Sequence, residues 1–412
     1  MFCKELEVKE ERFHAHGIHD VIAAKSIFTV FHPICSIARQ EILGFECLSR
    51  GNWKTTEVNP YQLFTAAGEY GCLLELDRLC REKAILTFKE KFDILEDKLL
   101  FLNIDTSILT ATNVGSNSFL DLVERAGLHP NKIVIEVLES RSDDEKALQT
   151  FVDRYRGMGF NIALDDVGMG NSNLNRIAQL RPDVVKIDRY LVNGMHFEVY
   201  KRAVFRGLVE IAHQVGAIVV AEGVENENDA LACLEEGADC IQGFFFCTPG
   251  ADVNTLKTEC KSKLEALSDS FRSFIINIIN SKRVRTSEQL AVFTCLAECL
   301  ESGSSLSQLS DFSEQIQKEN CTLQCFYILN ETGVQISPTL GIDSETGSRI
   351  FRPAQEGCDH SMKRYYLSLA SGLKRYISDP YLSCASGTVC QTLSAYVNWT
   401  GKRCILCADF SH

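Results

Sequence analysis

The 412-residue sequence has no long apolar segment. No run of apolar residues approaches the roughly 18 to 20 that a membrane-spanning helix needs. Residues 1–17 are charged throughout and lack the apolar stretch of a secretory signal peptide. Basic residues are also in deficit, since 42 lysines and arginines stand against 55 aspartates and glutamates, which gives a formal net charge of −13. Nonspecific binding of DNA or RNA requires a basic surface. We therefore expect a cytoplasmic protein with no membrane span and no nucleic-acid polymer as partner.

Cysteine, in contrast, is abundant, with 18 residues. The cysteines are scattered, and several lie within apolar strand-like runs, for example Cys35, Cys240 and Cys247. Because nothing indicates export, we interpret them as reduced and mostly structural thiols. Cys404 and Cys407 are three residues apart in a predicted strand, so their side chains face opposite sides and make a poor metal clamp. A zinc site is not expected, and redox sensing remains an alternative.

The apolar content of 45% is enough for packed cores, and the length predicts two or three domains. Residues 26–35 and 41–50 are predicted to form two antiparallel strands joined by a short polar turn, and residues 60–95 are helical. Strands then alternate with helices, and the predicted strands are 98–105, 132–137, 161–166, 183–188, 218–223 and 240–246. Apolar strands that alternate with helices indicate a parallel sheet covered on both faces. We predict an α/β fold, a TIM-like (β/α)8 barrel with an irregular start, with an open doubly wound sheet as the alternative.

Each predicted strand ends in a side chain that can do chemistry. These side chains are Glu46, Asn103, Glu136, Asp165 with Asp166, Lys186 with Asp188, Glu222 and Gln242. A barrel gathers its strand ends around one rim, whereas an open sheet would string them along an edge. The recurrence of oxygen- and amine-bearing residues at these positions therefore favours the barrel.

Asp165 and Asp166 follow an apolar strand directly and precede a loop that contains Gly168 and Gly170. Two adjacent carboxylates repel each other, and they persist where cations neutralise them or where one stays protonated. Carboxylate and amide oxygens suit Mg²⁺ or Mn²⁺, whereas a zinc or copper site would normally show His or Cys. Lys186 adds a fixed cation that can hold water or a phosphate oxygen. The pattern predicts metal-assisted hydrolysis of a phosphate ester.

Seven motifs carry a family resemblance. They are FECLSR, NID, IEVLES, DDVGMG, VKID, AEGVE and QGFFF, in this order over residues 26 to about 250. They resemble the motifs of the EAL-domain family of cyclic-di-GMP phosphodiesterases. The resemblance implies a TIM-like barrel whose first strand is antiparallel, two Mg²⁺ or Mn²⁺ ions per site, and hydrolysis of cyclic di-GMP to linear pGpG. The alternatives are a cyclic-di-GMP receptor that barely cleaves its ligand, and a hydrolase for another phosphodiester.

The resemblance also implies which residues bind metal. One ion would be held by oxygen-bearing side chains from four strands, which are Glu46, Asn103, Glu136 and Asp165. Asp165 would bridge to the second ion, and Asp166 would complete the second site. Glu222 would lie near the second ion or act as a base.

Other matched residues would act on water or on the substrate. Lys186 and Gln242 would position the attacking water, and Glu139 resembles the family glutamate that braces the loop after the two aspartates. The residues assigned to the substrate are Leu48, Arg50, Asp188 and Glu225. Arg50 is placed for a phosphate or a base edge. For Asp188 and Glu225, a structural role is the alternative.

The sequence departs from the family pattern at several positions. Cys47 takes the place of Ala or Val in the name-giving tripeptide, and His32 stands where the family usually has Gln. In the loop DDVGMGNSN, Val167, Met169 and Asn171 replace an aromatic residue, a hydroxyl and another aromatic residue. In the family this loop links metal occupancy to dimer contacts. Both aspartates and both glycines are retained, so we expect metal binding to be intact while turnover or its regulation is altered.

Strand and helix alternation stops after the predicted barrel, residues 1–252. A connecting helix, 253–284, carries apolar residues at spacings of three and four, which either pack on their own domain or join domains within a homodimer. Residues 285–412 are predicted to form helices at 287–302, 305–319 and 361–376, a hairpin at 321–337 and closing strands at 379–397 and 402–410. This region resembles sensory domains of the PAS or Cache kind. The resemblance implies a regulatory domain for an unknown small ligand, with a dimerisation or stability module as the alternative.

Overall fold

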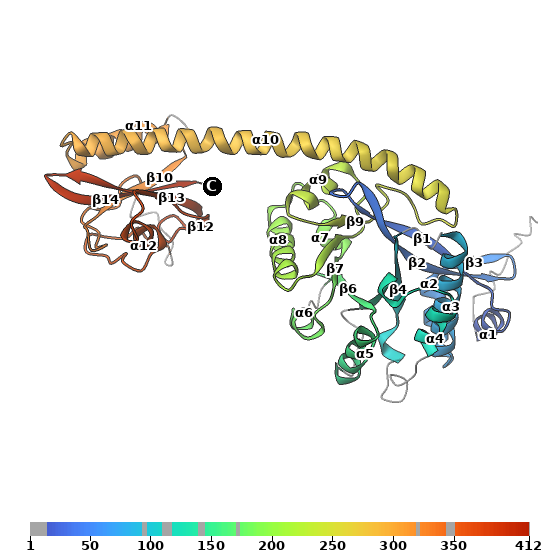
Figure 1. Ribbon diagram of the computed structural model, residues 1–412. Helices are drawn as coiled ribbons and strands as arrows, with labels where there is room; N and C mark the ends of the chain where they lie inside the picture. Colours follow the sequence, from blue (N-terminus) through green and yellow to red (C-terminus); the bar gives the residue numbers. More distant parts are fainter. Residues whose placement is uncertain are drawn as a thin grey trace, which may run out of the picture. The chain divides into compact units, whose positions relative to one another are not determined.

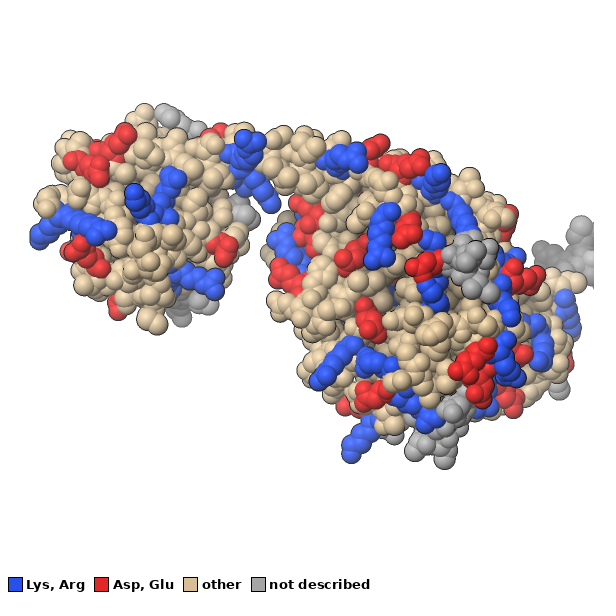
Figure 2. Space-filling model, viewed as in Figure 1, with Lys and Arg blue, Asp and Glu red and all other residues tan. Residues whose placement is uncertain are grey.

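The computed structural model describes residues 15–92, 97–108, 118–138, 145–169, 174–318, 322–342 and 351–411. The chain forms two units, Met1–Ile275 and Ile276–His412 (Figure 1). Within the described residues, no helix combines the length and apolar content that a bilayer crossing requires. On the face seen in Figure 2, acidic and basic side chains are interspersed over both units.

A closed barrel forms the first unit. Its strands are β1 (Ile27–Ser36), β2 (Glu41–Trp53), β4 (Leu99–Ile104), β5 (Ile133–Leu138), β6 (Asn161–Val167), β7 (Val184–Ile187), β8 (Ile218–Ala221) and β9 (Cys240–Ile241). The strands from β2 round to β9 pair in parallel. β1 pairs antiparallel with both β2 and β9 and so closes the sheet, and the short β3 (Thr56–Val58) extends β2. The predicted TIM-like barrel with an antiparallel first strand is confirmed, and the open sheet is wrong.

Helices surround this barrel (Figure 1). They are α1 (Ala15–Ala23), α2 (Pro60–Glu69), α3 (Leu73–Lys91), α4 (Ser118–Arg125), α5 (Glu145–Gly157), α6 (Asn175–Leu180), α7 (Arg189–Val192), α8 (Val199–Gln214) and α9 (Glu227–Glu235), with 3-10 turns η1 (Thr106–Ile108) and η2 (Pro130–Lys132). Local sequence sets their ends. At α2, Asn59 and Gln62 form a reciprocal capping box and Pro60 occupies the first turn. Along α5, Leu148 and Phe151 lie on the face that is buried in the core.

One continuous helix, α10 (Val253–Glu301), follows the barrel. Its first turns bury Leu256 and Leu264 in the core of the first unit, and its last turns bury Leu296 and Leu300 in the core of the second. The prediction of a connecting helix that ends before a separate helix at 287–302 is wrong. The intervening residues are polar, but they contain neither glycine nor proline, so nothing in them ends the helix.

A small antiparallel sheet is the centre of the second unit. Its elements are α11 (Leu306–Lys318), β10 (Leu323–Leu329), α12 (Arg364–Ala370), β11 (Arg375–Ile377), β12 (Tyr381–Leu382), β13 (Val389–Trp399) and β14 (Lys402–Ser411). The strand order is β10-β14-β13-β11, and β12 pairs with β13. The predicted hairpin at 321–337 forms only in part, because the return segment makes isolated bridges to β10, Leu329 with Gln335 and Phe326 with Leu340, whereas the continuous pairing of β10 is with β14. The helix predicted at 361–376 ends early, and its last residues form β11.

Candidate active site

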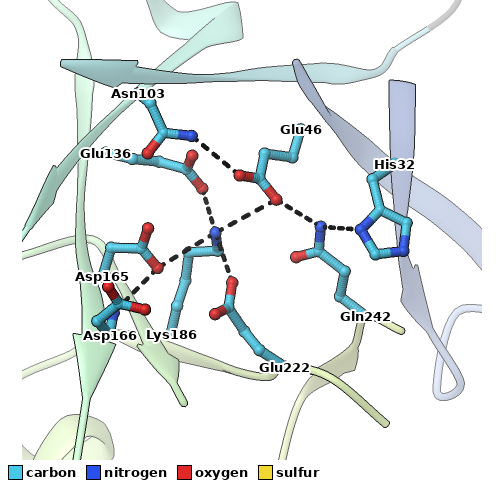
Figure 3. Close-up of polar contacts among 9 residues, drawn as sticks. All are labelled: His32, Glu46, Asn103, Glu136, Asp165, Asp166, Lys186, Glu222 and Gln242. Atoms are coloured by element: carbon cyan, nitrogen blue, oxygen red, sulfur yellow. Dashed lines mark hydrogen bonds and ion pairs between the residues drawn. The ribbon is translucent and has the colours of Figure 1, made fainter. Parts of the chain in front are cut away.

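The candidate site is the layer of side chains directly above the apolar filling of the barrel. That filling includes Phe101, Val134, Ala163, Val184, Val220 and Cys240. Two residues further along the same strands, and therefore on the same side of each strand, stand Asn103, Glu136, Asp165, Lys186, Glu222 and Gln242. The antiparallel β1 contributes His32, which is two residues before the buried Ile34 because this strand runs the other way. Because side chains two residues apart lie on the same side of a strand, these residues and Glu46 of β2 converge at one end of the barrel, which we call its mouth (Figure 3).

Lys186 is the hub of this layer. Its Nζ lies 2.5 Å from Glu222 Oε1, 2.6 Å from Glu136 Oε1, 3.3 Å from Asp165 Oδ1 and 3.7 Å from Glu46 Oε2. Burial disfavours the charge of this amine, but the surrounding carboxylates outweigh it and raise the pKa of Lys186 well above its ordinary value. The side chain is therefore a fixed cation.

The carboxylates outnumber this cation. Burial raises the pKa of Glu136, Asp165 and Glu222, and Lys186 only partly offsets the effect. Glu136 is fully buried, and its Oε2 has no hydrogen-bond partner among the described residues. Unpaired buried carboxylate oxygens are costly unless a cation or a proton meets them. This donor set therefore fits divalent cations bound by oxygen.

A local irregularity turns both aspartates toward the site. The pairing of β6 with β7 shifts register between Leu164 and Val167, and Asp166 has a φ of +57°, in the left-handed region. Aspartate is one of the few residues that tolerate this conformation, and such strain is concentrated at functional sites. As a result, ligand oxygens of Asp165, Asp166 and Glu222 lie within 4.8 Å of one another. Burial and the neighbouring Asp165 and Asp188 raise the pKa of Asp166 to about 6.

A hydrogen-bond chain fixes Glu46 on the other side of the mouth. Asn103 Nδ2 donates to Glu46 Oε1 at 2.9 Å, and Gln242 Nε2 donates to Glu46 Oε2 at 2.7 Å. The charge of Lys186 and these two donors outweigh burial and lower the pKa of Glu46. Gln242 Nε2 also lies 3.0 Å from His32 Nδ1, and burial lowers the pKa of His32, so this ring is neutral and accepts the bond. His32 stood out in the sequence only as a departure from the family pattern, although its place in the strand period marks it as part of this layer.

A cavity of about 330 Å³ adjoins this layer. Leu48 and Asn103 line it, together with Tyr61 and a buried ion pair in which Arg81 Nη2 lies 2.6 Å from Asp77 Oδ2. Sequence reasoning missed the last three, because they lie on α2 and α3, whose sequences read as ordinary amphipathic helices. Arg50, in contrast, donates to the carbonyl oxygen of Ser49 and forms an ion pair with Glu57 at 3.6 Å.

The remaining predicted residues lie around the site or beyond it. Asp188 caps α7 by accepting a hydrogen bond from the Tyr190 backbone at 2.8 Å, and it is close enough to Asp166 to act on its pKa. Glu225 is exposed and borders a separate hollow beside Phe244. Glu139 and Asn171 lie outside the described residues.

The family profile described as EAL domain matches residues 17–249, which is more than half of the chain. The chain belongs to the EAL domain family. The uncharacterized EAL-domain containing protein YkuI of Bacillus subtilis is 26% identical over 390 residues, which cover 89% of this chain and 91% of YkuI. The probable cyclic di-GMP phosphodiesterase PdeI of Escherichia coli is 27% identical over 261 residues, or 60% of this chain and 32% of PdeI. The alignment with this chain thus spans about a third of PdeI.

Likeness in fold extends beyond the EAL domain. The crystal structure of the Bacillus subtilis YkuI protein, in complex with substrate c-di-GMP and calcium, superposes with a TM-score of 0.73. It covers 96% of this chain and 99% of that chain at 23% sequence identity. The arrangement of an EAL barrel followed by a smaller unit is therefore shared with a solved structure. The family and the fold predicted from the motifs are confirmed.

Proposed function

We propose that the protein is a phosphodiesterase that hydrolyses cyclic di-GMP to linear pGpG with the help of divalent metal ions. The observation that carries this proposal is the convergence of carboxylates on the buried ammonium of Lys186 at the mouth of the barrel. The comparisons support it, because PdeI is named a probable cyclic di-GMP phosphodiesterase and the YkuI structure holds c-di-GMP as substrate.

Two ions, Mg²⁺ or Mn²⁺, fit the oxygen donors of this mouth. The first would be held by Glu46, Asn103, Glu136 and Asp165. The second would be held by Asp165 and Asp166, with Glu222 beside it. When bound, these cations would neutralise the carboxylates, polarise the phosphodiester and promote ionisation of the attacking water.

The protein's own groups would position and deprotonate that water. Lys186 Nζ offers a fixed positive charge to a water or phosphate oxygen, and Gln242 Oε1, which is buried without a hydrogen-bond partner among the described residues, offers an acceptor. Glu222 is the candidate base, because burial raises its pKa and lets it take a proton. The water oxygen would bond to phosphorus as Glu222 takes its proton, one ester P–O bond would break, and the released ribose oxygen would take up a proton from solvent, so that the ring opens. Leu48 and Arg50 would contact the nucleotide.

A second candidate function is a receptor that binds cyclic di-GMP without consuming it. The changed loop after Asp166 favours this function, since Met169 stands in place of a hydroxyl residue and its side chain is exposed. An assay of pGpG formation with Mg²⁺ or Mn²⁺ at micromolar protein separates the two. Saturable cyclic di-GMP binding with no product would overturn the enzyme. Faster cleavage of another phosphodiester in a substrate panel would overturn the assigned substrate.

We also propose that the second unit is a PAS-like regulatory domain, because it is a separate unit built around an antiparallel sheet.

We further propose that the protein is a homodimer. Support for the dimer comes from exposed apolar side chains on α7, α8 and the segment that joins them, which are Tyr190, Phe197, Val199, Tyr200 and Val204. Such a patch is costly to leave in water. Sedimentation of wild-type protein and of a Tyr200→Asp variant tests this assignment. A monomeric wild-type protein, or a variant that dimerises equally well, would contradict it.

A further inference from the structure

A cavity of about 80 Å³ lies on one face of the sheet in the second unit. Along β10 and β14, Phe326, Ile328, Leu406 and Ala408 pack in the cluster that contains residues of α10 and α11. The alternate residues Tyr327 and Asp409 line the cavity, because successive side chains of a strand point to opposite faces. His360, Tyr365, Tyr381, Arg352 and Lys363 also line the cavity. This cavity belongs to the second unit alone.

The carboxylate of Asp409 is buried in the wall of the cavity, with 3% of the residue exposed. Its Oδ1 accepts a hydrogen bond from Thr392 Oγ1 at 2.7 Å, and its Oδ2 lies 3.7 Å from the Cys325 thiol. These two groups are its partners among the described residues, and neither carries a positive charge. A buried carboxylate with no counter-charge is costly, so it calls for a proton or a cation.

Aromatic rings line the rest of the cavity. The ring centroids of Tyr327 and His360 lie 5.2 Å apart, and those of Tyr327 and Tyr365 lie 6.3 Å apart. Burial raises the pKa of Tyr327, Tyr365 and Tyr381 and lowers that of His360, so all four rings are uncharged at neutral pH. The faces of such rings attract cations.

One polar atom of the cavity has no partner. His360 is 6% exposed, and its Nδ1 contacts the Tyr365 hydroxyl at 2.6 Å. Its Nε2 is buried and has no hydrogen-bond partner among the described residues. Buried polar atoms are nearly always satisfied, so this nitrogen marks a place for a polar group of a ligand.

We propose that this cavity binds a small organic cation, an amine that is protonated at neutral pH, seated among the tyrosine rings with its N–H groups toward Asp409. Arg352 and Lys363 also line the cavity, but both are exposed and can turn to solvent. The charge that is fixed in the buried wall is negative, which favours a cation over an anion. The inference rests on the proposal that the second unit is a PAS-like regulatory domain, and it assigns a chemical class to a ligand of that domain.

The test uses the 412-residue chain and probes of similar size that differ in charge. Binding of propylammonium, tetramethylammonium, 1-propanol and propionate is measured by isothermal titration calorimetry and ligand-observed NMR at pH 7.5. We expect propylammonium to bind about tenfold more tightly than propanol or propionate, and more tightly than tetramethylammonium, which has no N–H group. Tighter binding of propionate, or no saturable binding of propylammonium, would overturn the proposal. Cyclic di-GMP is absent from the assay, so its result does not depend on the activity of the barrel.

Two substitutions then locate the probe. Asp409→Asn keeps the shape and a hydrogen-bond acceptor but removes the charge, and we expect it to weaken ammonium binding about tenfold or more. Asp379→Asn is the matched control, because Asp379 is an exposed aspartate of the same unit. Circular dichroism confirms that both variants are folded. Wild-type affinity in a folded Asp409→Asn variant, or equal losses in the two variants, would contradict the assignment.

Discussion

The ammonium nitrogen of Lys186 lies 2.6 Å from a carboxylate oxygen of Glu136, and both side chains are almost completely buried. Replacing Lys186 with Met keeps most of the side-chain volume but removes the positive charge that, in the proposed mechanism, would face the attacking water. We expect kcat to fall by about 10² to 10³, the usual cost of losing a group that stabilises the transition state, while the Kd for cyclic di-GMP changes by less than about tenfold. Lys146→Met, at an exposed position on the outer helix α5, is the control. Wild-type turnover in Lys186→Met would remove this residue from the mechanism.

Glu46 is held by Asn103 and Gln242 with one carboxylate oxygen directed to each. Glu46→Ala removes a proposed metal ligand and leaves both amides without their acceptor. Hydrolysis should fall to background with either Mg²⁺ or Mn²⁺, as measured by pGpG formation. Glu41→Ala serves as the comparison, since Glu41 begins the same strand and pairs with Lys98 away from the mouth. Residual activity close to wild type in Glu46→Ala would show that this carboxylate is not a ligand.

Removal of metal should expose the repulsion within the carboxylate layer. Glu136 is fully buried with one unpartnered oxygen, and burial raises its pKa. In EDTA, Glu136→Gln should therefore raise the free energy of unfolding, by roughly 1 to 3 kcal/mol. With Mg²⁺ or Mn²⁺ the wild type should instead be the more stable protein, because the variant lacks a metal ligand and bound metal stabilises it little. The measurement is the urea midpoint with and without metal. A variant that is less stable in EDTA, yet as strongly stabilised by metal as the wild type, would argue against the site.

The site was largely predictable because it depends on strand period and strand ends. Asn103, Glu136, Asp165 and Lys186 follow apolar interior residues at the same spacing, and this pattern is written in the sequence. The turn of Asp166 toward the site was not predictable in detail, since it depends on a register shift and a left-handed backbone. Arg81 and Asp77 were missed because helical periodicity does not reveal which part of a helix faces a cavity.

The second unit was harder to predict for a related reason. Asp409 lies in the apolar strand segment CILCADF, where a single carboxylate gives no signal of the rings that surround it. Those rings come from β10, the segment before α12, α12 and β12, and they meet only in the folded unit. The predicted end of the connecting helix at residue 284 is wrong, because the residues that follow contain neither glycine nor proline and α10 continues through them to Glu301.

Asp409 also predicts a pH dependence of stability. Burial raises the pKa of Asp409 from 3.8 to about 6, so the folded state binds a proton more tightly than the unfolded state does. The resulting stabilisation is fully present below pH 4 and is lost as the pH rises through 6, a difference on the order of 3 kcal/mol. The wild type should therefore lose stability relative to Asp409→Asn between pH 4 and pH 7. Trp399 of β13 reports unfolding of this unit in a Trp53→Phe background, because the chain has only these 2 tryptophans. If the stabilities of the two proteins change in parallel with pH, or if the wild type becomes more stable relative to the variant over this range, then Asp409 has a counter-charge and the interpretation is wrong.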